Sequence, residues 1–174
     1  FAYQILSFEQ THPKSEVRLN LIRTLTEASG LNGMVLGQCK DLEAEKYNTS
    51  LELKDIINLQ KLKTGALFSW SLKSANILAE QNNNPLEKYA DSIGLAFQIK
   101  DDLLDHEGTM EKIGKKAGKD NAAGKATLVS LLGVENAKKR CLELCEEACD
   151  SLNFFGAKSE ILKIAARFTI ERGF

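Results

Sequence analysis

Three aspartates within five residues interrupt a stretch that otherwise has the pattern of a buried helix: Asp101, Asp102 and Asp105. On a helix with 3.6 residues per turn, Asp101 and Asp105 lie one turn apart and Asp102 lies beside Asp105. Like charges packed together repel, and burial removes the water that would stabilise them. The stretch therefore predicts either a fully solvated helix face or a face against which a cation sits.

The same face is suited to one cation in particular. Gln98 shares a sector about 100° wide with the three aspartates, and hard oxygen ligands on one rigid face suit Mg²⁺. This ion keeps several waters and is usually shared between carboxylates and a substrate phosphate. A single D-D-x-x-D pattern is also typical of solvated acidic surfaces, so other parts of the chain must decide between the two interpretations.

The remaining pattern predicts helices only. The two prolines, Pro13 and Pro85, leave room for long uninterrupted helices, and we find no convincing strand pattern and no internal repeat. A length of 174 residues corresponds to about one domain. The sequence therefore predicts an all-α helical bundle in which residues 1–174 form a single domain.

Helix boundaries follow from caps and breakers. Thr49-Ser50-Leu51-Glu52 has the form of a capping box, and Asn84 before Pro85, with Glu87 in the first turn, is a strong helix start. The expected helices cover residues 1–12, 15–30, 31–46, 50–80, 85–106, 127–132, 135–154 and 157–171.

Charge and hydropathy argue against two classes of partner. The net charge of −1 creates no global field for nucleic acid or an anionic membrane surface. No apolar run approaches the roughly 20 residues of a membrane span, so we expect neither nucleic-acid binding nor stable membrane insertion. The chain starts at Phe1 within a helical apolar pattern, and Met34 and Met110 are internal. We therefore expect it to be part of a longer product.

Three of the four cysteines recur every four residues, at Cys141, Cys145 and Cys149, and so share one helix face. A soft-metal site would have this residue type, but Cys-x-x-Cys spacing and nearby histidines are missing. The pattern favours small, reduced packing residues, and thus a cytoplasmic protein or one in another reducing compartment.

Two lysine-containing segments could bind phosphate. Lys63-Thr64-Gly65 lies inside an expected helix, where Gly costs up to about 1 kcal/mol relative to Ala and usually permits a close approach by a backbone or a ligand. A surface lysine beside a packing notch is the simpler interpretation. Residues 107–125 contain five lysines directly after the acidic face. Alone they predict a solvated loop, whereas beside metal-binding carboxylates they predict a site for phosphate oxygens.

Taken together, these segments resemble a known family. Phe97-Gln98-Ile99-Lys100-Asp101-Asp102-Leu103-Leu104-Asp105 resembles the second aspartate-rich motif of trans-isoprenyl diphosphate synthases, most closely the bacterial farnesyl or geranyl diphosphate synthase type. The resemblance covers essentially the whole chain, because further matches occur in the family order: Gly37-Gln38 with Asp41-Leu42, Lys63-Thr64-Gly65-Ala66-Leu67, Tyr89-Ala90-Asp91-Ser92-Ile93-Gly94, Gly114-Lys115 with Gly118 and Asp120, and Gly124-Lys125-Ala126-Thr127.

The resemblance implies a helical bundle of the isoprenoid synthase type, a homodimer, and Mg²⁺-dependent condensation of isopentenyl diphosphate with an allylic diphosphate such as dimethylallyl or geranyl diphosphate. It also implies roles for matching residues. The implied metal ligands are Asp101, Asp102 and Asp105; the implied catalytic residues are Lys63, Thr64 and Gln98; and the implied substrate-binding residues are Phe97, Lys115, Lys125, Gln38 and Asp41.

This sequence also departs from the family pattern. Asp101–Asp105 is the only D-D-x-x-D in the chain, whereas the family uses two, and the basic residues that bind isopentenyl diphosphate upstream are absent. We therefore expect that the N-terminal helices of the fold are missing and that the chain alone is inactive. Smaller departures are Ala126 in place of Ser, Leu128 in place of Tyr, and few basic residues near the C-terminus beyond Arg172.

Two alternatives remain at the level of sequence. A class I terpene cyclase also uses an acidic metal motif, although Lys63-Thr64 and the glycine- and lysine-rich segment disfavour it. An inactive helical partner subunit, or an interaction module of the same fold, would explain the single aspartate motif. Product chain length does not follow from these residues, because in the family it depends on residues before the first motif.

Overall fold

The structure is a computed structural model that describes residues 1–47, 51–81, 84–107 and 127–173. These ranges contain helices and no strand, which confirms the all-α prediction. The elements are α1 (Ala2–Ser7), α2 (Ser15–Ser29), α3 (Met34–Tyr47), α4 (Leu53–Gln60), a π-helix (Lys61–Gly65), α5 (Ala66–Leu78), α6 (Asn84–Glu107), α9 (Leu128–Leu132), α10 (Val134–Ser151), a 3₁₀-helix (Asn153–Ser159) and α11 (Glu160–Glu171).

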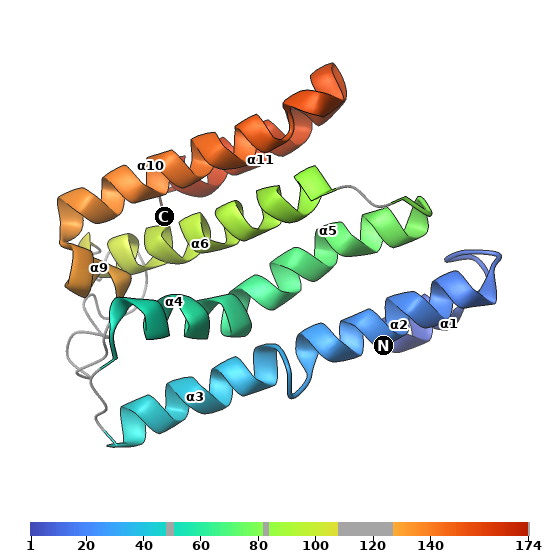
Figure 1. The fold of residues 1–174 in the computed structure, drawn as a ribbon, viewed down its shortest axis with the longest axis horizontal. Coiled ribbons are helices and arrows are strands. Elements are labelled where there is room, and N and C mark those ends of the chain that lie inside the picture. Colours follow the sequence, from blue (N-terminus) through green and yellow to red (C-terminus); the bar gives the residue numbers. More distant parts are fainter. Residues whose placement is uncertain (48–50, 82–83, 108–126, 174) are drawn as a thin grey trace.

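The longest of these helices, α6, lies in the middle of the arrangement (Figure 1). It packs against α10 and α11 on one side and against the π-helix and α5 on the other. Beyond these, α2 packs on α5 and α3 packs on the π-helix. The helix that carries the aspartates is therefore covered along most of its length. None of the described helices is both long enough and apolar enough to cross a membrane.

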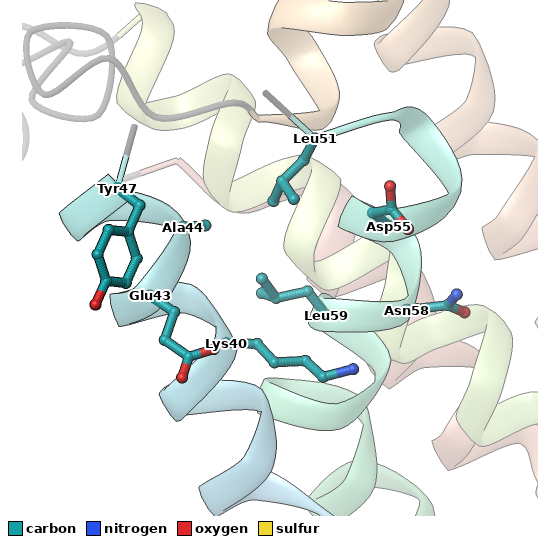
Figure 2. Close-up of a pocket in the computed structure, with 8 residues that line it drawn as sticks. All are labelled: Lys40, Glu43, Ala44, Tyr47, Leu51, Asp55, Asn58 and Leu59. Carbon is teal, nitrogen blue, oxygen red and sulfur yellow. The ribbon is translucent and has the colours of Figure 1, made fainter. Parts of the chain in front are cut away.

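A surface cavity of about 330 Å³ lies between α3 and the start of α4 (Figure 2). Both apolar and charged or polar side chains line it. The lining residues are Lys40, Glu43, Ala44 and Tyr47 from α3, and Leu51, Asp55, Asn58 and Leu59 from α4 and the segment before it.

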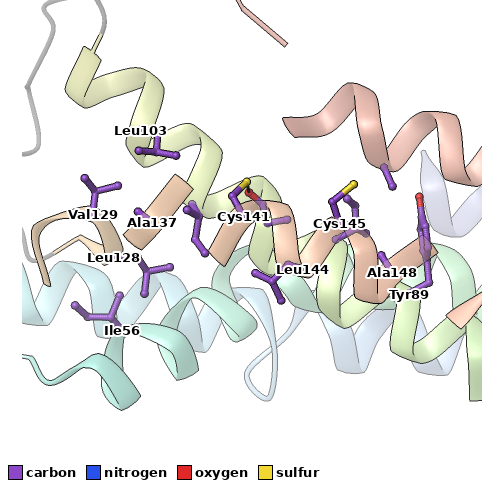
Figure 3. Packing of buried hydrophobic residues seen from close by; sticks show 14 of the residues in the cluster. Ile56, Tyr89, Leu103, Leu128, Val129, Ala137, Cys141, Leu144, Cys145 and Ala148 are labelled. Atoms are coloured by element: carbon purple, nitrogen blue, oxygen red, sulfur yellow. Dashed lines mark hydrogen bonds between the residues drawn. The ribbon is translucent and has the colours of Figure 1, made fainter. Parts of the chain in front are cut away.

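The hydrophobic core is built on one face of α6. Its buried residues Tyr89, Ile93, Ala96, Ile99 and Leu103 recur three to four positions apart, as expected for an amphipathic helix. The facing helix α10 buries five residues, of which all but Leu144 are small, and this lets the two backbones approach closely (Figure 3). They are Ala137, Cys141, Leu144, Cys145 and Ala148. These contacts bury most of the apolar surface of α6, the main source of its stability.

The cysteines of α10 pack in this core, as predicted. Cys141 and Cys145 are buried, and the Cys141 thiol donates a hydrogen bond to the carbonyl oxygen of Ala96 at 3.4 Å. Burial raises the pKa of Cys141 to about 11. Burial, followed by the neighbouring Cys149, raises the pKa of Cys145 to about 11. Both side chains are therefore neutral thiols at ordinary pH.

Most helices begin and end near their predicted positions, but two predictions are wrong. The helix predicted for residues 1–12 ends at Ser7, because Phe8 has an extended backbone with φ −70° and ψ 146°. The helix predicted for residues 50–80 is wrong in two respects. It begins at Leu53, and its capping box pairs Glu52 with Asp55, whose carboxylate accepts a hydrogen bond from the Glu52 backbone N–H at 3.3 Å. Thr49 and Ser50, which the prediction used, lie outside the described residues. The helix is also interrupted by the π-helix.

Candidate functional site

The site begins with a close contact between two backbones. A Cβ atom added to Gly37 of α3 would lie 2.3 Å from the backbone nitrogen of Lys63 and 2.6 Å from its Cα atom. Only glycine fits there, so α3 lies directly against the π-helix. Asp41, one turn further along α3, is thereby placed beside the side chain of Lys63.

Lys63 and Asp41 form an ion pair, with 2.6 Å between Lys63 Nζ and Asp41 Oδ2. Asp41 is only 6% exposed, whereas the Lys63 side chain is 29% exposed. The lysine thus neutralises a buried carboxylate and still reaches the surface. Because an ammonium group carries three N–H donors, Lys63 can donate to a second anion while it stays paired with Asp41.

The glycine inside the predicted helix lies in a short π-helix. π-Helices are rare and are frequently found at functional sites. Gly65 is the last residue of this one, and the backbone of α6 passes close by: a Cβ on Gly94 would lie 3.7 Å from the Cα of Gly65. The prediction that this glycine permits a close approach is not confirmed, because a Cβ on Gly65 would meet only Gln60 O at 3.7 Å and Lys61 Cβ at 3.9 Å, both at ordinary contact distances within its own segment.

A chain of hydrogen bonds leads from the π-helix across α6 to α9. The Thr64 hydroxyl donates to Gln98 Oε1 at 3.2 Å, and Gln98 Nε2 donates to Asp102 Oδ1 at 3.2 Å. The backbone N–H of Leu128, at the start of α9, donates to Asp102 Oδ2 at 3.1 Å. Asp102 is 7% exposed. Its carboxylate therefore points inward and ties α9 to α6.

The other two aspartates have a different environment. Asp101 has a 37% exposed side chain and forms an ion pair with Arg172, and Asp105 is half-buried. They lie one turn apart on α6. Among the described residues, no group of three or more His, Cys, Asp or Glu side chains converges as a metal site. Two carboxylates nevertheless fit Mg²⁺, which usually binds one or two carboxylates plus substrate phosphates.

Phe97 lies next to these groups, one turn before Asp101. Its ring packs on Phe68 with 5.2 Å between ring centroids and an angle of 49°. The guanidinium of Arg172 lies over the Phe97 ring, 4.1 Å from its centroid. No local sequence pattern predicts that Arg172 meets Asp101 and Phe97, because 71 positions separate Arg172 from Asp101.

The structure thus brings together eight of the eleven residues that the sequence analysis selected, or places them on neighbouring turns. They are Asp41, Lys63, Thr64, Phe97, Gln98, Asp101, Asp102 and Asp105. Gln38 lies on α3 with an exposed side chain. Lys115 and Lys125 lie outside the described residues. The cavity between α3 and α4 contains none of the selected residues.

Comparison with known proteins identifies the family. The sequence profile of the Polyprenyl synthetase family matches residues 2–164. The chain belongs to the polyprenyl synthetase family. Among its relatives, the farnesyl diphosphate synthase of Micrococcus luteus is 38% identical over 165 residues, which cover 93% of this chain and 56% of the relative. The farnesyl diphosphate synthase of Escherichia coli is 36% identical over 179 residues, which cover 98% and 59%.

Solved structures agree with the assignment of this chain to the polyprenyl synthetase family. The FPP/GFPP synthase of Zymomonas mobilis superposes with a TM-score of 0.86 and 43% identity, over 97% of this chain and 56% of that one. A geranyltransferase of Helicobacter pylori, complexed with magnesium and isoprenyl diphosphate, superposes with a TM-score of 0.76 and 27% identity, over 97% and 55%. The chain therefore spans about half the length of the relatives it matches.

Proposed function

We propose that this polyprenyl synthetase chain contributes to a short-chain trans-prenyltransferase. The reaction joins isopentenyl diphosphate head to tail with dimethylallyl or geranyl diphosphate, and the product is farnesyl diphosphate or a related short-chain diphosphate. One observation carries the proposal. Lys63 and Thr64 lie against the helix of Gln98 and the three aspartates, in a chain 36% to 38% identical to two farnesyl diphosphate synthases.

Asp101 and Asp105 would hold Mg²⁺, directly or through water, and Asp102 would support them. Asp102 already accepts two hydrogen bonds, so its proposed part is to fix the α6 face from which the other two extend. Bound Mg²⁺ would stabilise the negative charge that builds up on the leaving diphosphate. The magnesium in the complex of the Helicobacter pylori geranyltransferase supports the choice of metal.

The remaining residues of the site would bind and orient the allylic substrate. Lys63 would donate to the diphosphate while Asp41 holds its ammonium in place. Thr64 and Gln98 would present oxygen atoms to the allylic cation, and their mutual hydrogen bond fixes both side chains. Phe97 would lie near the isopentenyl group. Lys115 and Lys125 are proposed diphosphate contacts, and Gln38 is a proposed substrate contact.

The chain supplies a single D-D-x-x-D motif, and the family reaction uses two facing motifs. We therefore propose that these 174 residues provide half of the metal site and that they do not catalyse the condensation alone. We further propose a homodimer in a reducing compartment such as the cytoplasm, where free cysteines are stable.

A chimera tests this function. In it, the chain replaces the matching segment of the Micrococcus luteus farnesyl diphosphate synthase, to which it is 38% identical. The chimera is expected to convert geranyl diphosphate and labelled isopentenyl diphosphate into farnesyl diphosphate. Adding Asp101→Asn is expected to lower kcat by a factor of about 100 or more, because a metal ligand is lost. A folded chimera without turnover, or one that Asp101→Asn leaves unaffected, would contradict the proposal.

The single aspartate motif also favours a second candidate, an inactive partner subunit or interaction module of the same fold. That candidate predicts a folded chimera that forms no farnesyl diphosphate. The chimera assay thus separates the two functions.

A further inference from the structure

Arg172, directly after α11, contacts two residues of α6 that lie one turn apart. Its Nη2 donates to Asp101 Oδ1, and its guanidinium lies 4.1 Å from the centroid of the Phe97 ring. The Arg172 side chain is only 20% exposed. The planar guanidinium is suited to both contacts at once, because it can pair with a carboxylate at its edge and stack on an aromatic ring with its face.

We infer that Arg172 competes with the metal ion for Asp101 and must leave this carboxylate before the ion can bind. This inference rests on the proposed function, because it requires Asp101 to be a metal ligand. A guanidinium paired with a carboxylate oxygen occupies the position that a coordinating cation needs. Two cations beside one carboxylate also repel each other, most strongly where little water screens them.

The geometry of Arg172 indicates that this contact can be released. Its Nε–H is buried and has no hydrogen-bond partner among the described residues. A buried donor without a partner is unfavourable, so the paired position of Arg172 is less stable than its two contacts alone suggest.

The backbone permits the same movement. Arg172 has left the helical conformation, with φ −53° and ψ 130°, and its N–H caps α11 by donating to Phe168 O at 3.0 Å. The next residue, Gly173, is exposed. The arginine side chain can therefore move away from Asp101 while α11 keeps its hydrogen bonds.

Titration with Mn²⁺, monitored by the electron paramagnetic resonance of the free ion, tests the competition in the full chain. Arg172→Gln is expected to bind Mn²⁺ about two- to five-fold more tightly than the wild type, the range that a partly exposed ion pair contributes. Arg172→Lys is expected to give an intermediate affinity, because it keeps the charge but loses the planar fork.

The matched control is Arg167→Gln. Arg167 lies on α11, carries the same charge and pairs with the exposed Glu160 at 3.4 Å, away from Asp101. Its replacement is expected to leave Mn²⁺ affinity unchanged. Thermal melting by circular dichroism verifies that every variant is folded before titration.

Asp101→Asn separates the two possible failures. If Asp101→Asn weakens Mn²⁺ binding but Arg172→Gln and Arg172→Lys leave it unchanged or weaker, competition is refuted and the metal site stands. If Asp101→Asn binds Mn²⁺ as the wild type does, the metal role of Asp101 is refuted. The proposed competition between Arg172 and the metal ion is then refuted as well. Support for the competition requires that the gain from Arg172→Gln disappears in the Asp101→Asn background.

Discussion

At the scale of single residues, the site depends on charges that are neutralised inside the protein. The clearest case is the Lys63–Asp41 pair, in which a buried carboxylate on α3 meets a lysine of the π-helix. Removing one partner of a buried pair leaves the other desolvated, which destabilises the folded state more than the pair itself stabilises it.

Lys63→Met is therefore expected to lower the free energy of unfolding by about 1–3 kcal/mol, because Asp41 stays buried without the lysine charge. Urea denaturation measures this change. The double variant Lys63→Met with Asp41→Asn is expected to recover part of the loss, because the buried charge is then gone.

Lys14→Met is the matched control for this prediction. Lys14 pairs with Glu80 at the same distance of 2.6 Å, but both side chains are about half exposed. Water solvates each charge there, so the stability is expected to remain almost unchanged. An equal loss in Lys14→Met and Lys63→Met would contradict the burial argument.

Some of these residues could be predicted from the sequence, and others could not. Asp101 and Asp105 stand out in the sequence as candidate metal ligands, because like charges one turn apart on a helix are unfavourable without a counter-ion. The inward orientation of Asp102 could not be predicted, since it depends on where α9 begins in space. The position of Arg172 depends on the packing of α11 against α6, a contact between distant segments.

At the scale of the elements, the close packing of α3 against the π-helix positions the site. Gly37→Ala would place a methyl group 2.3 Å from the Lys63 backbone nitrogen, so one of the two helices has to move. Overpacking of this kind is expected to lower the free energy of unfolding by about 1–3 kcal/mol or more. The movement would also lengthen the Lys63–Asp41 ion pair. Urea denaturation measures the loss of stability.

Gly94→Ala provides the comparison. Its Cβ would meet the Cβ of Phe68 at 3.6 Å, an ordinary van der Waals contact, in the interior of α6. Alanine favours a helix over glycine by up to about 1 kcal/mol. This variant is therefore expected to be as stable as the wild type or more stable, and a large loss would show that the contact distances do not decide the outcome.

Helix positions were largely predictable, because apolar spacing and caps are local properties of a sequence. The helix start at Asn84 and the length of α6 follow from the Asn84-Pro85 signal and the apolar pattern after it. The π-helix was not predictable, because its wider turn is set by the packing of α3 and α6 against it. The start of α4 was missed because two carboxylates, Glu52 and Asp55, cap it in place of hydroxyl groups.

At the scale of the whole molecule, the buried thiols of the core make stability depend on alkaline pH. Burial raises the pKa of Cys141 from 9.0 to about 11, and the pKa of Cys145 rises likewise. Between these values the folded protein keeps thiol protons that the unfolded chain releases. The contribution of these two thiols to the free energy of unfolding is therefore fully present below about pH 9. It is lost as the pH rises toward about 11.

Cys141→Ala is expected to reduce this decline, because one of the two thiols no longer titrates. Urea denaturation between about pH 8 and about pH 10 measures the slope. Cys39→Ala is the control, since Cys39 is exposed on α3 and its removal is expected to leave the slope unchanged. A stability that rises over this range, or equal slopes in both variants, would contradict the assignment of the core thiols.

The proposed function requires that the aspartate face of α6 binds a diphosphate through Mg²⁺. The most direct measurement is isothermal titration of the chain with inorganic pyrophosphate, with and without Mg²⁺. We predict that Mg²⁺ strengthens pyrophosphate binding about ten-fold or more and that Asp101→Asn removes this gain. Glu87→Gln, an exposed change in the first turn of the same helix, should keep it. Pyrophosphate binding that is equally strong without Mg²⁺, or a gain from Mg²⁺ that Asp101→Asn leaves unchanged, would contradict this role of the aspartate face.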